Sequence, residues 1–318
     1  MKRVILDMDP GVDDALAMIL ALRSPELKVE AITVVSGNIQ LELCVKNALQ
    51  VLDLLEIDDV PVSVGASRPL KRETVNASGV HGSDGLGGLN RFIKPDGTKR
   101  YPDPTGKPSS IPAVEHILDL VDRLKQDVSV ISTGPLTNIA QAIIEDSKTM
   151  RKVGKLIIMG GAFSVSGNVT PVAEFNAYAD PDAVQVVLDS GIRPLTYVGL
   201  DVTQKVRLYR DQLHRQGNKT KISQFVKDCT EFYMDFHKEN DGFDGCYLHD
   251  PLAVGVAIQP DIVKTKDLYV QVETSSRITM GMTVADFRPR CTDRPNASVC
   301  IDVDADRFMT MFFERVLI

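Results

Sequence analysis

Apolar runs that lack the alternation of a half-buried strand, each followed by an amphipathic stretch, constrain the fold of this chain most strongly. The pairs are "RVILDMD" with "DDALAMILALRS", "VEAITVVSGN" with "LELCVKNALQVLDLL", and "KLIIMGGAF" with "PDAVQVVLDSG". Strands that are apolar on both faces belong to parallel sheets that helices cover on both sides. The sequence therefore predicts an α/β fold, a doubly wound and mostly parallel open sheet with helices on both faces.

The size and charge of the chain limit its organisation and its partners. A length of 318 residues allows one large domain or two smaller ones. No linker or internal repeat divides the sequence, so we expect a single domain over residues 1–318. The net charge of −7 argues against a nucleic-acid partner, because nucleic-acid-binding proteins usually carry a basic face. A small neutral or cationic ligand fits this charge better.

The N-terminus and the cysteines indicate where the protein resides. The chain enters "VILDMD" directly after Met-Lys-Arg, and that run is too short for a signal peptide or a membrane helix. The five cysteines are odd in number, scattered and without a C-x-x-C pair, which is typical of reduced thiols and not of a zinc site. We therefore expect a cytoplasmic protein with no membrane segment.

Four aspartates stand within eight positions in "LDMDPGVDD", where the first predicted strand meets the first predicted helix. An aspartate that caps the helix would account for only one or two of them. Asp9, Asp13 and Asp14 would still converge at one strand end, where clustered carboxylates either raise one another's pKa or bind a cation. Oxygen ligands of this kind favour Ca²⁺ or Mg²⁺.

Polar side chains also gather in the loop "SGNVTPVAEFNAYADPDA", which follows a predicted strand. Asn168, Glu174 and Asn176 together could bind several hydroxyl groups, as a sugar requires. Asparagines that form turns are an equally good explanation of this loop taken alone. Because ligands of doubly wound folds bind beyond the carboxyl ends of the strands, the loop is a candidate binding segment.

Three other segments have weaker signals. In "YLHDPLAVGVAI", His249 and Asp250 precede an apolar helix, a position at which capping is the more common role. The Gly-rich stretch at 78–89 could approach a ligand closely through its backbone. Residues 94–110 are predicted to be a surface insertion.

Seven segments, taken in order, resemble the nucleoside hydrolase family of the inosine-uridine preferring type. They are "DMDPGVDDALAM", "VVSGN", "VHGSDGLGG", "STGPLTNIA", "MGGAF", "GNVTPVAEFNAYADPDA" and "HDPLAV". The combination of a "DxDPGxDD" start with a "GNxTPxAEFN" loop is specific to that family. The resemblance spans residues 4 to 258, and residues 259–318 carry no signature. It implies hydrolysis of the N-glycosidic bond of ribonucleosides, with release of the free base and ribose.

The resemblance also implies the residues of the site. A Ca²⁺ ion would be held by Asp9, Asp14, Asp250 and the main-chain carbonyl of Thr133. The ribose hydroxyls would contact Asp13, Asn38 and Asn176, with Asn168 and Glu174 at the 5′-hydroxyl. The nucleobase would lie near His81 and His249, with Tyr233 stacked on it as a lid. Tyr233 and His237 stand four apart on a predicted helix, although aromatic residues at that spacing are usually core.

The expected mechanism follows from these roles. Asp9 would act as general base toward a water that Ca²⁺ orients, and the attack would invert the anomeric carbon. Asp13, Asn38 and Glu174 would surround the oxocarbenium-like charge on the ribose. His249 would protonate purine leaving groups. The resemblance also implies a homodimer or homotetramer.

Two alternative functions compete with this interpretation. A haloacid dehalogenase-like phosphatase would use Asp7 as nucleophile and Asp9 as acid, but the sequence has no convincing match to that family's later acidic pair. A non-catalytic nucleoside-binding protein would be expected to lack Asp9 or His249, and both are present.

Overall fold

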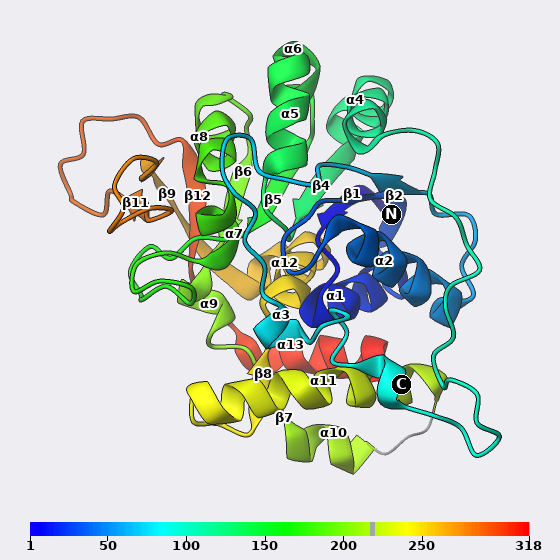
Figure 1. Ribbon diagram of the computed structural model, residues 1–318. Helices are drawn as coiled ribbons and strands as arrows, with labels where there is room; N and C mark the ends of the chain where they lie inside the picture. The colour runs from blue at the N-terminus through cyan, green and yellow to red at the C-terminus, as the bar shows by residue number, and fades with distance from the viewer. Residues whose placement is uncertain (217–219, 318) are drawn as a thin grey trace.

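The computed structural model describes residues 1–216 and 220–317 (Figure 1). Its central sheet has eight strands in the order β3-β2-β1-β4-β5-β6-β12-β9. The strands are β1 (Lys2–Met8), β2 (Leu27–Val34), β3 (Val62–Val64), β4 (Val128–Ser132), β5 (Lys155–Met159), β6 (Leu195–Val198), β9 (Val263–Leu268) and β12 (Ala297–Val303). All neighbouring pairs are parallel except β12 and β9. The predicted fold class is confirmed.

Two apolar clusters cover the two faces of this sheet. One is built with α1 (Val12–Leu22), α2 (Leu41–Leu55), α11 (Lys221–Asn240), α12 (His249–Ile258) and α13 (Ala305–Phe312). The other is built with α4 (Ala113–Leu124), α5 (Thr137–Glu145) and α8 (Pro181–Asp189). Helices α1 and α12 are apolar and buried on nearly every side because they pack against each other as well as on the sheet.

The order of the strands reverses at β1, and this reversal places the site. β2 pairs with one edge of β1 and β4 with the other, so that Asp7 lies between Thr33 and Ser132. In open α/β sheets, the crevice beyond such a reversal is where ligands bind. "DMDPGVDD" therefore leaves the sheet at its most favourable position for a site.

Shorter elements surround the sheet. They are α3 (Ser78–His81), α6 (Ser147–Met150), α7 (Phe175–Ala179), α9 (Leu200–Thr203), α10 (Arg210–Gln216), the antiparallel pair β7 (Arg207–Tyr209) with β8 (Gly245–Tyr247), and the antiparallel pair β10 (Val270–Val272) with β11 (Thr283–Ala285). Single turns of tighter or wider helix occur at Leu89–Arg91, Lys125–Asp127, Pro260–Ile262 and Phe313–Leu317. Figure 1 shows α11, in yellow, lying outside the sheet with β7, β8 and α10 beside it.

Residues 94–110 form the expected surface insertion, and most of them are exposed. The segment is nevertheless fixed to the body of the protein at Tyr101, which is buried and donates its hydroxyl to Asp228 Oδ2 at 2.7 Å. Arg100 forms an ion pair with the same carboxylate at 2.8 Å. The insertion is thus attached to α11.

Residues 259–303, for which the sequence made no prediction, supply β9 and β12 to the sheet. All five cysteines fall within the described residues and are free thiols. Across 1–216 and 220–317, no helix has both the length and the apolar character needed to cross a membrane.

Candidate functional site

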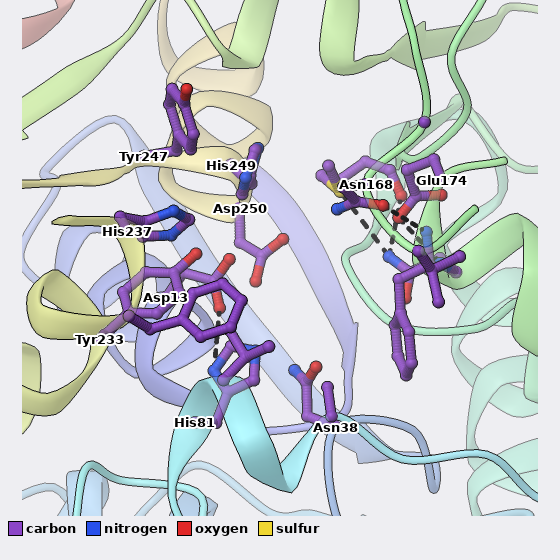
Figure 2. Close-up of a pocket in the computed structure, with 18 of the residues that line it drawn as sticks. Asp13, Asn38, His81, Asn168, Glu174, Tyr233, His237, Tyr247, His249 and Asp250 are labelled. Carbon is purple, nitrogen blue, oxygen red and sulfur yellow. Dashed lines mark hydrogen bonds and ion pairs between the residues drawn. The ribbon is translucent and has the colours of Figure 1, made fainter. Parts of the chain in front are cut away.

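A cavity of about 590 Å³ opens beyond the carboxyl ends of the parallel strands (Figure 2). Ten of the predicted site residues line it, namely Asp13, Asn38, His81, Thr133, Asn168, Glu174, Asn176, Tyr233, His249 and Asp250. The remaining two, Asp9 and Asp14, are fully buried. The structure therefore brings together residues from Asp9 to Asp250, which are 241 positions apart in the sequence, through the ends of the strands and the helices that follow them.

Three buried carboxylates converge at one end of this cavity. One oxygen from each of Asp13, Asp14 and Asp250 lies within 4.8 Å of the others. Asp13 and Asp14 occupy the first turn of α1, and Asp250 occupies the first turn of α12. Like charges at this separation in a buried site repel one another strongly unless a proton or a cation lies between them.

Hydrogen bonds hold Asp14 firmly within this group and Asp9 beside it. Asp14 accepts from Gly11 N at 3.0 Å, Asn38 Nδ2 at 3.0 Å and Thr133 Oγ1 at 2.7 Å. Asp9 Oδ2 accepts from Asn38 N at 2.7 Å. Among the described residues, Oδ1 of Asp9 has no partner and is buried. One oxygen of Asp9 is thus anchored, and the other is available.

Burial raises the pKa of every carboxyl group in the cluster. The pKa of Asp9 and that of Asp250 lie well above the ordinary value. Desolvation by burial is the largest cause, and the neighbouring carboxylates raise both pKa values further. The pKa of Asp13 is raised to about 8 by burial and by Asp14. Oδ1 of Asp13, like that of Asp9, is buried and has no hydrogen-bond partner in the described part of the chain, although His81 Nδ1 lies 3.8 Å from it. These residues fit a hard divalent cation, which would supply the missing positive charge.

The donor set differs in one respect from the expected one. Asp13, expected at the ribose, groups with Asp14 and Asp250, whereas Asp9 lies beside that group. The carbonyl of Thr133, an expected ligand, accepts a hydrogen bond from Asn176 Nδ2 at 2.6 Å. Figure 2 shows Asp13 and Asp250 pointing toward the same space.

Gly37 and Gly134 lie so close to the Asp9 carboxylate that a side chain at either position would collide with it. A Cβ atom at Gly37 would lie 2.0 Å from Asp9 Oδ2, and one at Gly134 would lie 2.7 Å from Asp9 Oδ1. We expect Gly37→Ala to displace Asp9 and to lower kcat at least about tenfold, since small misplacements of catalytic groups have large effects. Gly79→Ala is the matched control, because no atom lies within 4 Å of its added Cβ. Equal kcat values for the two variants would contradict the prediction.

Asp7 supports the cluster from behind. Its carboxylate accepts hydrogen bonds from Thr33 Oγ1 at 2.7 Å, Asn138 Nδ2 at 2.8 Å and Ser132 Oγ at 3.3 Å. Burial raises its pKa to about 6 in spite of these bonds. With its oxygens already engaged by these bonds, Asp7 lies behind the cluster and not in the cavity.

The predicted sugar-binding side chains lie on the opposite side of the cavity (Figure 2). Glu174 is the N-cap of α7 and accepts from Asn176 N at 2.8 Å, Gly161 N at 2.9 Å and Ala177 N at 3.1 Å. Asn168 Oδ1 accepts from Phe175 N at 2.9 Å. The loop is therefore ordered by its own polar side chains, and Glu174 is both a cap and a wall of the cavity.

Aromatic and imidazole rings form the remaining wall. His81 and Tyr233 stack with ring centroids 5.2 Å apart, and Tyr233 meets His237 edge-on at 4.6 Å. The ring centroid of Tyr247 lies 5.0 Å from that of His237 and 5.2 Å from that of His249. Tyr233 is thus buried like a core residue and also lines the cavity, and its stacking on a nucleobase stays a prediction.

His249 does not cap its helix, since the N-cap residue of α12 is Leu248. His249 Nδ1 lies 2.7 Å from Thr203 Oγ1, and burial lowers the pKa of the imidazole to about 3. Thr203 and Tyr247 were not predicted, because both contact His249 from other elements. Asp241, also missed, stands four positions after His237, which is the spacing of neighbours on a helix.

The chain is similar to known nucleoside hydrolases over nearly its whole length. The family model described as "Inosine-uridine preferring nucleoside hydrolase" matches residues 4–310. The pyrimidine-specific ribonucleoside hydrolase RihA of Salmonella gallinarum is 40% identical over 315 residues, which cover 98% of this chain and 97% of that protein.

Solved structures of nucleoside hydrolases are also similar to this chain over nearly its whole length. The purine-preferring ribonucleoside hydrolase from Gardnerella vaginalis superimposes with a TM-score of 0.90 at 35% identity, covering 99% of this chain and 98% of that one. A plant nucleoside hydrolase, PpNRh1, superimposes with a TM-score of 0.90 at 33% identity, covering 99% of both chains. The similarity therefore includes proteins whose names state different base preferences.

Proposed function

Because the chain belongs to the inosine-uridine preferring nucleoside hydrolase family and is an N-ribosyl hydrolase, we propose that it cleaves purine and pyrimidine ribonucleosides in a Ca²⁺-dependent reaction. The observation that carries the metal dependence is the convergence of Asp13, Asp14 and Asp250 within 4.8 Å at the end of a cavity. Family membership favours this function over phosphate-ester hydrolysis by Asp7, and the engaged oxygens of Asp7 agree with that preference.

The cation would be held by Asp9, Asp14, Asp250 and the carbonyl of Thr133. When bound, it supplies a Lewis acid and a fixed positive charge that orients polar groups of the substrate. The raised pKa values of the carboxyl groups and the unpartnered Asp9 Oδ1 support this assignment.

Asp9 is proposed as the general base. Its Oδ2 is fixed by Asn38 N, so that Oδ1 can accept the proton of the attacking water in one defined direction. As the N-glycosidic bond lengthens, positive charge develops on the ribose. Asp13 and Glu174 would stabilise that charge by their carboxylates, and Asn38 by its amide dipole.

His249 is proposed to assist the leaving base. Its lowered pKa favours a neutral ring, and a hydrogen bond from the Thr203 hydroxyl to Nδ1 would leave the proton on Nε2. The neutral ring could then donate a hydrogen bond from Nε2 to a purine nitrogen and stabilise the negative charge that develops there as the bond to the ribose breaks.

We expect His249→Ala to lower kcat/KM for inosine by about 10²-fold and for uridine by less than about tenfold, because the departing purine presents a ring nitrogen that can accept this hydrogen bond. The measurement is steady-state ribose release on both nucleosides. Thr203→Val removes only the partner of Nδ1. It should lower the ratio of kcat/KM for inosine to kcat/KM for uridine as well, but by a smaller factor than His249→Ala. Equal losses on the two substrates would exclude His249 as a purine-specific donor.

The test of the proposed function is the release of free ribose from inosine, adenosine, guanosine, uridine and cytidine. Each is assayed without phosphate, before and after prolonged chelation, and after Ca²⁺ is restored. Ribose release that depends on Ca²⁺ would support the proposal. Nucleoside binding without ribose release would indicate a binding protein, and hydrolysis of p-nitrophenyl phosphate would indicate the phosphatase.

Three coarser features complete the proposal. We propose one domain over residues 1–318, supported by two apolar clusters that share one sheet. We propose a cytoplasmic location, supported by five free thiols. We propose a homodimer or homotetramer on the family resemblance, and light scattering after size-exclusion chromatography measures which of them forms.

A further inference from the structure

His237, which is buried, and Asp241, whose side chain is 38% exposed, form a hydrogen-bonded pair at the C-terminal end of α11. Their Nδ1 and Oδ2 atoms are 2.6 Å apart, and the histidine side chain is 7% exposed. A carboxylate can only accept a hydrogen bond, so the Nδ1 atom of His237 must carry the proton. Asp241 therefore fixes both the orientation and the tautomer of this ring.

The other ring nitrogen of His237 has no hydrogen-bond partner among the described residues. Nε2 is buried, and His237 lines the cavity between Tyr233 and Tyr247 (Figure 2). Burial lowers the pKa of the imidazole, whereas Asp241 acts in the opposite direction. A neutral ring with its proton on Nδ1 presents a lone pair at Nε2, and buried polar atoms of this kind are rarely left unpaired.

His81 presents the opposite polarity on the other side of Tyr233. Its Nδ1 accepts a hydrogen bond from Val12 N at 3.1 Å, so that the proton of the neutral ring lies on Nε2. The ring of Tyr233 stacks on His81 and meets His237 edge-on. The two imidazole rings beside Tyr233 therefore carry opposite polarity, an N–H donor at Nε2 of His81 and an acceptor at Nε2 of His237.

We propose that Nε2 of His237 accepts a hydrogen bond from a ring N–H of the nucleobase, which makes His237 a specificity-determining residue and Asp241 its positioning residue. Uracil, at N3, and hypoxanthine and guanine, at N1, carry such a donor beside a carbonyl group. The inference rests on the proposed function, because it takes this cavity as the nucleoside site.

The test removes the donor from the substrate and the acceptor from the protein. kcat/KM is measured for uridine with 3-methyluridine, and for inosine with 1-methylinosine, on the wild type and on His237→Phe. In the wild type, methylation is expected to lower kcat/KM at least about tenfold, since a site built to bind an N–H rejects an analogue without it. In His237→Phe, the same methylation is expected to lower it by less than about threefold.

The possible outcomes distinguish a failure of the proposed role of His237 from a failure of the proposed nucleoside hydrolysis. If methylation lowers kcat/KM by the same factor in both proteins, or leaves it unchanged in the wild type, His237 does not read the base and the inference is overturned. If the wild type releases no ribose from any parent nucleoside, it is the proposed function that fails.

A second variant tests the role of Asp241 without changing the ring. The amide of Asp241→Asn can donate as well as accept, so the tautomer of His237 is no longer fixed and discrimination against the methylated substrates should fall at least about threefold. Asp235→Asn is the matched control, because Asp235 lies on the same helix, is exposed and pairs with Arg210 at 2.5 Å. Identical discrimination in the Asp241 and Asp235 variants, both confirmed as folded by thermal unfolding, would overturn the positioning role.

Discussion

Replacing Asp9 by asparagine is expected to lower kcat about 10³-fold or more on every nucleoside that the wild type cleaves, because loss of a general base alone removes about 10²–10⁴-fold. The same variant should be at least as stable as the wild type when both are free of metal. Burial and the neighbouring carboxylates already raise the pKa of Asp9, so that removal of this charge relieves repulsion inside the site.

The measurements are steady-state ribose release and thermal unfolding in the presence of a chelator. Asp7→Asn is the matched comparison, because Asp7 accepts three hydrogen bonds and is proposed to support the cluster. Its variant should lose more stability and less kcat than the Asp9 variant. Retention of more than about a tenth of wild-type kcat by Asp9→Asn would exclude Asp9 as the general base.

Removal of the divalent cation is expected to abolish ribose release and to make the free energy of unfolding fall as the pH rises from 7 to 8.5. The carboxyl groups of Asp9, Asp13 and Asp250 have raised pKa values in the folded protein, to about 8 for Asp13. The stabilisation that these carboxyl groups give the fold is complete only below their pKa in the unfolded chain. It is lost as the pH rises through their higher pKa in the folded protein. A bound cation replaces those protons and should flatten this dependence.

The pH window lies above the range in which the buried histidines act. The buried cysteine thiols, whose pKa values are raised in the folded protein, contribute to the slope near its upper end, but equally with and without the cation. Burial lowers the pKa of His81 and of His249 to about 3, and such groups stabilise the fold increasingly up to the unfolded histidine value of about 6.5. Urea unfolding at pH 7 and at 8.5, with chelator and with Ca²⁺, measures the difference. At a Ca²⁺ concentration 100 times Kd, we expect about 2.7 kcal/mol of stabilisation. An equal pH slope in both conditions would contradict the proposed metal site.

The fold could be predicted as far as the chain carries strongly apolar strands. β1, β2, β4 and β5 are buried along most of their length, and their sequences contain the signal of a parallel sheet. β9 was missed because "VKTKDL" is exposed at four of its six positions and lies antiparallel at the edge of the sheet. An edge strand of this kind has no apolar run by which a sequence could reveal it.

The site was predictable where its residues follow strand ends in short motifs. Asp9, Asp13, Asn38 and Glu174 all lie at or beside the cavity for that reason. The tautomers of the histidines could not be predicted, because their partners come from elsewhere in the fold. Thr203 is 46 positions from His249, and Val12 is 69 positions from His81. Asp241 was within reach of sequence reasoning, but a histidine and an aspartate four apart are common on helices.

Helix α11 carries Tyr233 and His237, whereas the carboxylate cluster belongs to α1 and α12 and to the end of β1. The two sets of residues can therefore change independently during evolution. If His237 reads the base as proposed, mutations in α11 would alter which base is accepted and leave the proposed bond-breaking groups in place. A lineage with this architecture would then acquire a new base preference through a few changes on one helix, without passing through an inactive ancestor.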